Sequence, residues 1–374
     1  MAMMEGDGLP DGITQLRAAG QLVWLDDLGR HLLDTGGLAR HIRKGVTGVT
    51  SNPAIFAEAI RSSAYDETIR RLSGEGLPPA AIAERVVLED VGRAADLLRA
   101  VHDETAGADG FVSIEVAPAL AHDVDGTVAE AHRLWDALAR PNVMIKVPGT
   151  EAGVEALRRL IGDGINVNVT LLFSPRRYAA VLEAHAAALD ERIAGGATSL
   201  PASVASFFLS RIDAAIDPVL DARGGPWALP LRGLAAIASA RAAYETLTDF
   251  LASDRWRVLA AHGASVQRLL WASTSTKNPA YAPTKYVEPL ALPNTINTMS
   301  RQTLAAALAI GGPRVVEEFP TLEALSGKLA ELDIDTADVA RRLEAEGIAK
   351  FIAAQEALEA AVAARLAPAP APPG

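Results

Sequence analysis

The sequence predicts an α/β fold, a (β/α)8 or TIM barrel with additional helices that include a C-terminal helical extension. Eight short apolar or β-branched runs are spread along the 374 residues. The segments between them have apolar residues at three- and four-residue spacing, as in VAEAHRLWDALA. Strands that alternate with helices indicate βαβ units and a parallel sheet, and eight such strands suggest a closed barrel.

The predicted strands follow one another at uneven intervals along the chain. They are residues 22–27, 45–51, 111–116, 143–148, 165–170, 203–210, 268–273 and 294–299. The alternative is a doubly wound open sheet. That fold carries the dinucleotide fingerprint G-x-G-x-x-G after its first strand, whereas LDDLGRHLL stands there in this chain.

The long intervals follow the second and sixth predicted strands, and each has room for more than one helix. We therefore expect a single domain over residues 1–366, with helical insertions at about 57–107 and 212–262. Beyond about residue 320 the pattern is helical up to 366. The last eight residues, APAPAPPG at 367–374, are expected to form a disordered tail.

Composition excludes several classes of protein. Hydrophobic residues make up 49% of the chain, which supplies a large core, and the net charge of −11 comes without any basic run. A surface for nucleic acid needs clustered Lys and Arg, so none is expected. There is no cysteine, no apolar stretch long enough for a membrane helix and no signal-peptide pattern at the N-terminus. We expect a cytoplasmic protein that is a monomer or a homodimer.

Polar residues interrupt the predicted strands near their carboxyl ends, which face the active-site mouth in a barrel. Lys146 stands out because the chain has only six lysines, yet one lies in the apolar run VMIKVP. Burial would raise its neutral-amine fraction, which Schiff-base chemistry requires. The alternative is a structural lysine paired with Glu115 or Asp26. Glu115, in an equally apolar strand, is either a buried proton shuttle or the partner of that lysine.

The other polar strand residues each have a plain structural alternative. Asp26 and Asp27 point to opposite faces, so only one can face inward, and either could cap a helix. Asn52 precedes a proline, which is typical of a helix start. Asn168 and Thr170 share one face of their strand and would line the site or form a core network.

Two cations follow the sixth and seventh predicted strands, where barrels often bind phosphate. They are Arg211 and Lys277, with hydroxyl groups nearby on residues 273–275. The alternative for each cation is a surface salt bridge. Metal chemistry is weakly supported, because the seven histidines form no HExxH motif and HDVDG at 122–126 is typical of a turn. We expect no metal and no cofactor.

Four segments, in order along the chain, resemble those of the transaldolases, class I Schiff-base enzymes of the pentose phosphate pathway. GVTSNPAIF resembles their second-strand signature, VMIKVPGTEAG the segment around their Schiff-base lysine, and GINVNVTLLFS their fifth-strand signature. WASTSTKNPAY resembles the phosphate-side motif of the longer bacterial branch. The family is a (β/α)8 barrel, which agrees with the pattern of strands and helices.

The resemblance implies a catalytic role for four residues. Lys146 would be the nucleophile that forms an imine with a ketose carbonyl. Asp26 would be the base that removes a hydroxyl proton during carbon–carbon cleavage. Glu115 and Thr170 would handle the water lost and regained as the imine forms and breaks.

It also implies the contacts to a phosphorylated sugar substrate. Asn52 and Asn168 would hydrogen-bond the three-carbon unit with support from Thr50, while Ser206 would contact its terminal hydroxyl and Phe208 would form part of the pocket.

At the phosphate end, the resemblance assigns the binding to Arg211 with help from Ser275. Lys277 stands where much of the family has Arg, so a point charge replaces a bidentate fork there.

The implied reaction moves a dihydroxyacetone unit from sedoheptulose 7-phosphate to glyceraldehyde 3-phosphate. Two alternatives stay open. One is an aldolase that cleaves fructose 6-phosphate; that branch of the superfamily has Tyr where this chain has Phe208, so the phenylalanine favours transfer. The other is a catalytically inactive barrel that acts as a binding protein.

Overall fold

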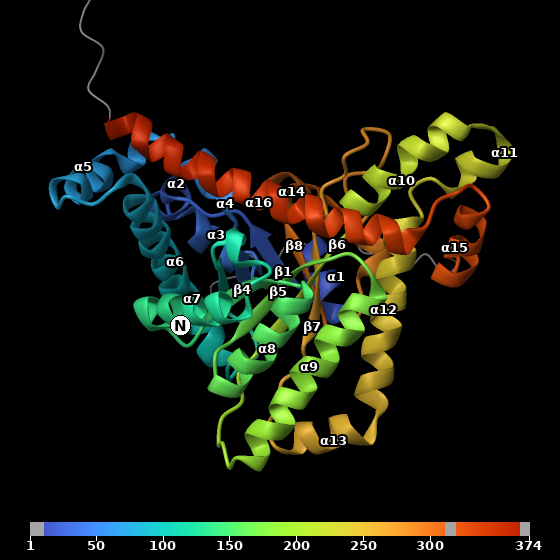
Figure 1. Cartoon of the computed structure of the whole chain (residues 1–374), viewed down its shortest axis with the longest axis horizontal. Helices are drawn as coiled ribbons and strands as arrows, with labels where there is room; N and C mark the ends of the chain where they lie inside the picture. The colour runs from blue at the N-terminus through green and yellow to red at the C-terminus, as the bar shows by residue number, and fades with distance from the viewer. Residues whose placement is uncertain (1–10, 311–318, 367–374) are drawn as a thin grey trace, which may run out of the picture.

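The computed structural model describes residues 11–310 and 319–366, and it shows eight parallel strands closed into a barrel in chain order, with β8 paired to β1 (Figure 1). The predicted barrel is confirmed, and closure excludes the doubly wound open sheet. The strands are β1 (Gln21–Asp26), β2 (Gly48–Thr50), β3 (Val112–Glu115), β4 (Val143–Pro148), β5 (Val167–Leu172), β6 (Ser203–Phe208), β7 (Arg268–Ala272) and β8 (Thr295–Met299).

Each predicted run overlaps one observed strand, but several ends differ. β2 begins three residues later than expected because Gly45, with φ of 95°, turns the chain after the preceding helix. β5 extends to Leu172 and carries an irregular register between Val169 and Leu172. β6 ends at Phe208, since Ser210 already begins a helix.

Helices surround the barrel between the strands. Before β3 lie α1 (Asp11–Ala18), α2 (Arg30–Asp34), α3 (Gly37–Arg43), α4 (Pro53–Ala59), η1 (Ser63–Tyr65), α5 (Asp66–Gly74) and α6 (Pro79–Glu104). Up to β6 follow η2 (Pro118–Leu120), α7 (Val124–Leu138), α8 (Glu151–Asp163) and α9 (Pro175–Ala194). The rest are α10 (Ser210–Arg223), α11 (Gly225–Ala228), η3 (Leu229–Leu231), α12 (Ala235–Ala252), α13 (Asp254–Ala261), η4 (Glu288–Leu290), α14 (Arg301–Ala309), α15 (Leu322–Ala330) and α16 (Thr336–Leu366).

Local sequence explains how these helices begin and end. Thr150 caps α8 by accepting a hydrogen bond from the Gly153 N–H, and Gly164 ends the helix in the left-handed conformation with φ of 90°. The HDVDG segment is a helix start as well, because Asp123 caps α7 through the Gly126 N–H. The expected tail at 367–374 lies outside the described residues.

The core fills the barrel and the layer between the barrel and its helices. Trp24 and Trp271 are fully buried, and Phe207 packs edge-on against Trp271 with ring centroids 6.2 Å apart. Trp24 lies directly over Gly48, where an added Cβ would meet the indole at 2.3 Å. A glycine is therefore required at the start of β2. Among the described residues, no helix is long and apolar enough to cross a membrane.

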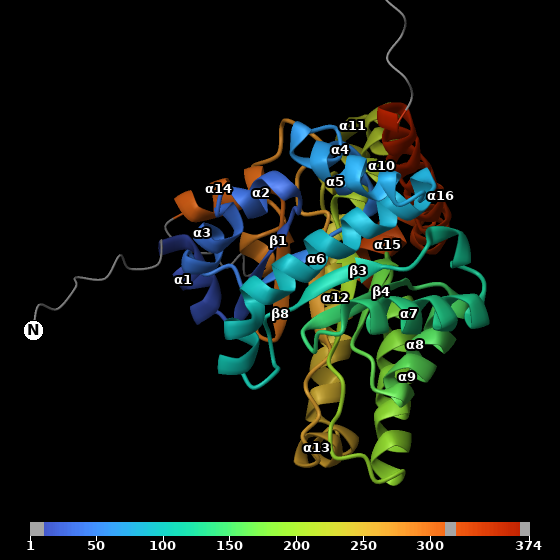
Figure 2. The same ribbon diagram turned by 90° about the vertical axis from the view of Figure 1, so that its left-hand side faces the viewer.

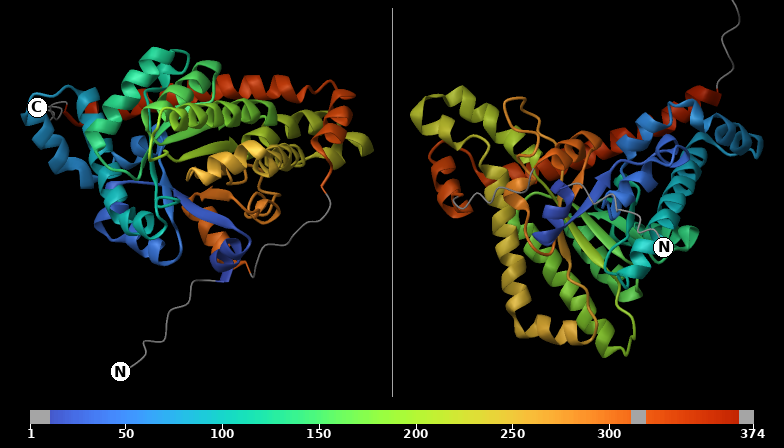
Figure 3. Two further views of the ribbon diagram at one scale, coloured as in Figure 1. Left: turned by 90° about the horizontal axis from the view of Figure 1, so that it is seen from below. Right: turned by 180° about the vertical axis from the view of Figure 1, so that it is seen from behind.

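The C-terminal helix α16 crosses one end of the barrel, where it packs on α4, α6 and α10. Figure 2 and the right-hand view of Figure 3 show it at the same end as α4, α5 and α10, opposite α13. It also contacts β5, where Gly347 lies against Leu171 near the carboxyl end of the strand, and η2, which follows the carboxyl end of β3. The helix therefore lies over the mouth of the barrel toward which the strands point.

Candidate active site

A cavity of about 310 Å³ opens at the carboxyl ends of the strands. Ten of the predicted site residues line it: Asp26, Thr50, Asn52, Lys146, Thr170, Ser206, Phe208, Arg211, Ser275 and Lys277. The barrel thus gathers side chains from five strands, and from the segments after β2, β6 and β7, around one space. Glu115 and Asn168 do not line the cavity.

Lys146, which lines this cavity, forms a buried ion pair with Glu115. They are register partners on β4 and β3, and the Lys146 Nζ lies 3.6 Å from the Glu115 Oε2. The same Nζ donates to the backbone oxygen of Ser51 at 3.3 Å. The lysine side chain is only 5% exposed, yet it lines the cavity. The structural pairing foreseen as an alternative is present, and it leaves the amine at the cavity wall.

Glu115 holds a proton more tightly than an ordinary glutamate. Burial raises the pKa of its carboxyl to about 7, and the nearby Lys146 charge opposes part of that rise. Its two carboxylate oxygens are buried without a hydrogen-bond partner, since 3.6 Å is too long for a hydrogen bond to the amine. Such a group can accept or give up a proton near neutral pH.

This raised pKa predicts a pH-dependent stability. Between the ordinary glutamate pKa of 4.5 and about 7, the folded state binds more protons than the unfolded state, so stability falls as pH rises through this window. Glu115→Gln removes the titration. Between about pH 5 and pH 8, we expect the free energy of unfolding to fall in the unmodified protein by up to about 3 kcal/mol more than it does in the variant.

Urea denaturation at a series of pH values measures this difference. Glu323→Gln, on the exposed face of α15, is the matched control and should follow the unmodified protein. Parallel pH curves for the unmodified protein and the Glu115 variant would contradict the raised pKa.

Asp26, rather than Asp27, faces the cavity. Thr50, its register partner on β2, donates to the Asp26 Oδ1 at 2.8 Å, and the Thr298 hydroxyl lies 2.6 Å from the Thr50 hydroxyl. The single Thr50 proton goes to the carboxylate, so Thr298 must donate to Thr50. Burial raises the pKa of Asp26 above its usual range, while the charge of Lys146 and the Thr50 hydrogen bond oppose the rise.

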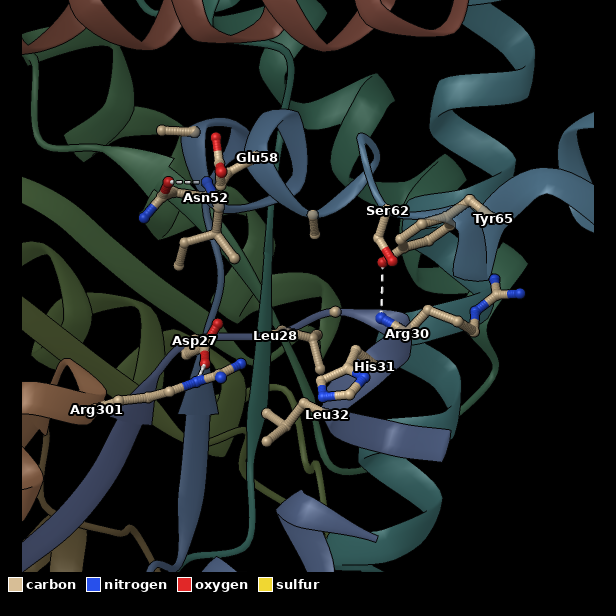
Figure 4. A pocket seen from close by; sticks show the side chains of 14 residues that line it. Asp27, Leu28, Arg30, His31, Leu32, Asn52, Glu58, Ser62, Tyr65 and Arg301 are labelled. Atoms are coloured by element: carbon tan, nitrogen blue, oxygen red, sulfur yellow. Dashed lines mark hydrogen bonds and ion pairs between the residues drawn. The ribbon is translucent and has the colours of Figure 1, made fainter. Parts of the chain in front are cut away.

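Asp27 points the other way and pairs with Arg301 (Figure 4). Neither aspartate caps the next helix, because α2 has Gly29 at its cap position with no side-chain hydrogen bond. The helix-cap alternative for the two aspartates is therefore wrong.

Asn52 serves as a helix cap and also reaches the cavity. Its Oδ1 accepts from the Ile55 N–H at 3.1 Å, with Pro53 in the first turn of α4. It also borders a neighbouring open hollow of about 520 Å³ (Figure 4). That hollow is larger, but it lacks Lys146, Asp26 and Thr170. The convergence of ionisable groups therefore belongs to the smaller cavity.

Asn168 lies beneath the cavity wall. It is fully buried, its Nδ2 donates to the Ser113 Oγ at 2.9 Å, and its Oδ1 accepts from the Ser206 Oγ at 2.7 Å. The core-network alternative describes its contacts, and through them Asn168 orients Ser206, which does line the cavity. Thr170 is different, because its buried Oγ1 has no hydrogen-bond partner and adjoins the cavity.

The cavity side that follows the paired strands β6 and β7 is cationic. The Arg211 guanidinium lies 5.2 Å from the Phe208 ring centroid, and its Nη1 is buried without a hydrogen-bond partner. Within the described ranges no carboxylate lies within 4 Å of Arg211 or Lys277, so neither forms the salt bridge offered as an alternative. The Ser275 hydroxyl lies 2.8 Å from that of Ser300. Two cations and a hydroxyl thus border a space that suits an anion.

The backbone is strained at the mouth. Leu171 and Ser273, which follow Thr170 and Ala272, have φ of 60° and 53° although neither is a glycine. Conformations of this kind cost energy and persist where the surrounding structure imposes them, which is typical of functional sites.

Sequence reasoning missed several cavity residues. Thr298 lies in the last predicted strand, where the alternating polar positions of NTINTM offered a signal, and Ser300 follows that strand. Lys350 and Phe351 come from α16 and offered none, because no local pattern tells which surface a helix covers. In the part of the chain that the structure describes, no group of three His, Cys, Asp or Glu side chains is placed to hold a metal ion.

Comparisons with known proteins match this chain to a single family of enzymes. A family model described as Transaldolase/Fructose-6-phosphate aldolase matches residues 23–362. Transaldolase of a Parafrankia species is 45% identical over 345 residues, covering 91% of this chain and 94% of the relative. Transaldolase 1 of Streptomyces coelicolor is 45% identical over 368 residues, or 97% of each chain, and transaldolase of Acidothermus cellulolyticus is 45% identical over 360 residues, with 95% and 96% covered.

Proposed function

The chain belongs to the transaldolase and fructose-6-phosphate aldolase family, and we propose that it is a transaldolase that works through a Schiff base on Lys146. It would move a dihydroxyacetone unit reversibly from sedoheptulose 7-phosphate to glyceraldehyde 3-phosphate, giving erythrose 4-phosphate and fructose 6-phosphate. The observation that carries this proposal is the buried amine of Lys146, which borders the cavity beside the protonatable Glu115.

The first half of the reaction forms the imine. The Lys146 amine attacks the ketose carbonyl, and the carbinolamine loses its oxygen as water. Glu115 has the pKa to supply and recover that proton near neutral pH. The free Thr170 hydroxyl adjoins the same space and can hold the departing water.

The second half breaks the carbon–carbon bond. A protonated imine withdraws electrons, so Asp26 can take the proton from the neighbouring hydroxyl while an aldehyde leaves and an enamine remains. The raised pKa of Asp26 makes it a better base than an exposed aspartate. The acceptor aldehyde then reacts with the enamine, and hydrolysis frees the new ketose. Asn52 and Ser206, which line the cavity, would bind hydroxyls of the three-carbon unit.

The phosphate of the sugar would bind at the cationic side. Arg211 brings an unpartnered guanidinium nitrogen, Ser275 a hydroxyl and Lys277 an exposed charge, while Lys350 approaches from α16. A lysine binds phosphate as a point charge, whereas an arginine forms two parallel hydrogen bonds.

Lys277→Ala should weaken binding of phosphorylated donors in particular. We expect KM for fructose 6-phosphate to rise roughly tenfold with little change in kcat, since one exposed charge contact contributes on the order of 1 kcal/mol. Lys277→Arg should lower KM. Steady-state kinetics with fructose, which lacks the phosphate, should show no effect of either change.

Lys44→Ala, an exposed lysine at the end of α3, is the control for loss of charge. Equal losses with fructose and fructose 6-phosphate would show that Lys277 does not contact the phosphate.

Borohydride reduction in the presence of fructose 6-phosphate tests the proposed function. A reduced three-carbon adduct on the Lys146 peptide is expected. With no acceptor aldehyde, a transaldolase turns over slowly, whereas a fructose-6-phosphate aldolase releases dihydroxyacetone freely; Phe208 favours the first outcome. Absence of an adduct on any lysine would favour the inactive binding-protein alternative.

The cellular role of the protein is part of the same proposal. We propose that it acts in the non-oxidative pentose phosphate pathway in the cytoplasm, with phosphorylated sugars as partners and without nucleic acid, membrane, metal or cofactor. It would work as a monomer or a homodimer, and every proposed catalytic residue comes from the same chain.

A further inference from the structure

The C-terminal helix contributes an aromatic ring to the active site. Phe351 of α16 lines the same cavity as Lys146, and its ring centroid lies 5.5 Å from the Lys146 Nζ. The side chain is 6% exposed, so one part of it is packed and another part meets the cavity. No other described aromatic ring lies within cation–π distance of this amine.

Close packing holds this ring in place. One turn before Phe351, Gly347 sits so near the barrel that an added Cβ would meet the Leu171 Cδ2 at 2.8 Å and the Arg211 Nη1 at 3.4 Å. Leu171 is the residue with the strained backbone after Thr170. On another side of the helix, Glu344 pairs with Arg177 at 3.6 Å. The segment 344–351 is thereby fixed against the mouth of the barrel.

The proposed chemistry needs a barrier at this position. The enamine left on Lys146 has two fates. An acceptor aldehyde can form a carbon–carbon bond with it, which is transfer. Alternatively, its carbon takes a proton from solvent, and one water then adds to the iminium, so that dihydroxyacetone and the free amine are released. Release consumes the same single water that imine formation produced, with no oxidation or reduction.

Productive turnover needs one water at the imine but no bulk solvent. Glu115 has two buried carboxylate oxygens without partners, and Thr170 has one such hydroxyl. The Thr170 hydroxyl lines the cavity and can hold that one water, while Glu115, 3.6 Å from the Lys146 amine, can exchange its proton. The enamine therefore remains available for the acceptor if the side toward α16 excludes solvent, and an apolar ring over the amine does this.

We infer that Phe351 is a specificity-determining residue that covers Lys146 and favours transfer over release of dihydroxyacetone. This inference rests on the proposed Schiff-base function. It assigns to α16 a part in the reaction, in addition to its part in the packing of α4, α6 and α10.

The test compares two fates of one intermediate in Phe351→Ala and Phe351→Leu. Fructose 6-phosphate is given with and without erythrose 4-phosphate as the acceptor, and sedoheptulose 7-phosphate and free dihydroxyacetone are measured. Phe351→Ala should raise the ratio of release to transfer roughly tenfold, since about 1.4 kcal/mol changes a partition by that factor. Phe351→Leu retains an apolar cover and should stay near the unmodified ratio.

Leu358→Ala is the matched control, because Leu358 is buried on the same helix and does not line the cavity. It should cost stability without changing the ratio. A ratio in Phe351→Ala equal to that of the unmodified enzyme, in folded protein, would overturn the inference and make Phe351 a helix anchor only. The same holds if Leu358→Ala changes the ratio equally. Failure of the unmodified enzyme to form a borohydride adduct would remove the proposed function itself, which is a separate result.

Discussion

Lys146→Ala is expected to lower kcat by roughly four to six orders of magnitude, as is typical when a covalent nucleophile is removed. No other lysine is expected to replace it, because Lys277 and Lys350, the other lysines that line the cavity, are exposed, whereas Lys146 is buried beside Glu115. The variant should also form no borohydride adduct with fructose 6-phosphate. A coupled assay of turnover and peptide mass mapping measure the two effects.

The loss must be separated from a loss of folding. The change leaves the Glu115 carboxyl without its cationic neighbour, and burial then favours the protonated form still further. A neutral Glu115 carries no unpaired charge into the core, so we expect a folded variant. Lys328→Ala, an exposed lysine on α15, is the control and should retain full activity. Retention of more than about 1% of kcat by Lys146→Ala would contradict its role as nucleophile.

Asp26→Asn should stop the reaction at a different step. The amide has nearly the shape of the carboxylate and can still accept the Thr50 hydrogen bond at its oxygen, so the site should keep its geometry. Without the base, the hydroxyl proton cannot be removed and the carbon–carbon bond stays intact. We expect kcat to fall by roughly two to four orders of magnitude. The imine itself should still form.

The trapped species distinguishes this role from a structural one. Borohydride should capture the entire six-carbon sugar phosphate on Lys146 in Asp26→Asn, but only the three-carbon unit in the unmodified enzyme. Asp27→Asn is the matched control, because Asp27 is the adjacent residue and pairs with Arg301 away from Lys146. Capture of the three-carbon unit by Asp26→Asn at the unmodified rate would show that another group is the base.

The strands and most of the site residues could be predicted because their signals are local. Lys146 inside VMIKVP and Asn168 inside INVNVT are polar residues among apolar neighbours, and each is buried with specific partners. The choice between Asp26 and Asp27 could not be made locally. Strand alternation says that the two residues point apart, but which one points inward depends on the register of β1 with β2 and β8.

Register also decided what each buried polar group does. Asn168 and Thr170 lie on one face of β5, yet Asn168 is occupied by Ser113 and Ser206 from neighbouring strands, while the Thr170 hydroxyl remains free. The difference arises from partners that are distant in sequence. The two raised carboxyl pKa values have the same origin, since desolvation depends on how many atoms of other elements surround the group.

The barrel, the order of its strands and the polar residue types at their carboxyl ends could be predicted, because periodicity and composition act over a few residues. The position of α16 over the mouth, with the Phe351 ring centroid 5.5 Å from the Lys146 Nζ, could not, because it depends on contacts between distant parts of the chain. An amphipathic helix shows in its sequence that one face will be buried. Packing determines which surface the helix covers. In this protein, Gly347 packs closely against Leu171 and Arg211 at the carboxyl-terminal end of the barrel, which exists only once the barrel has folded.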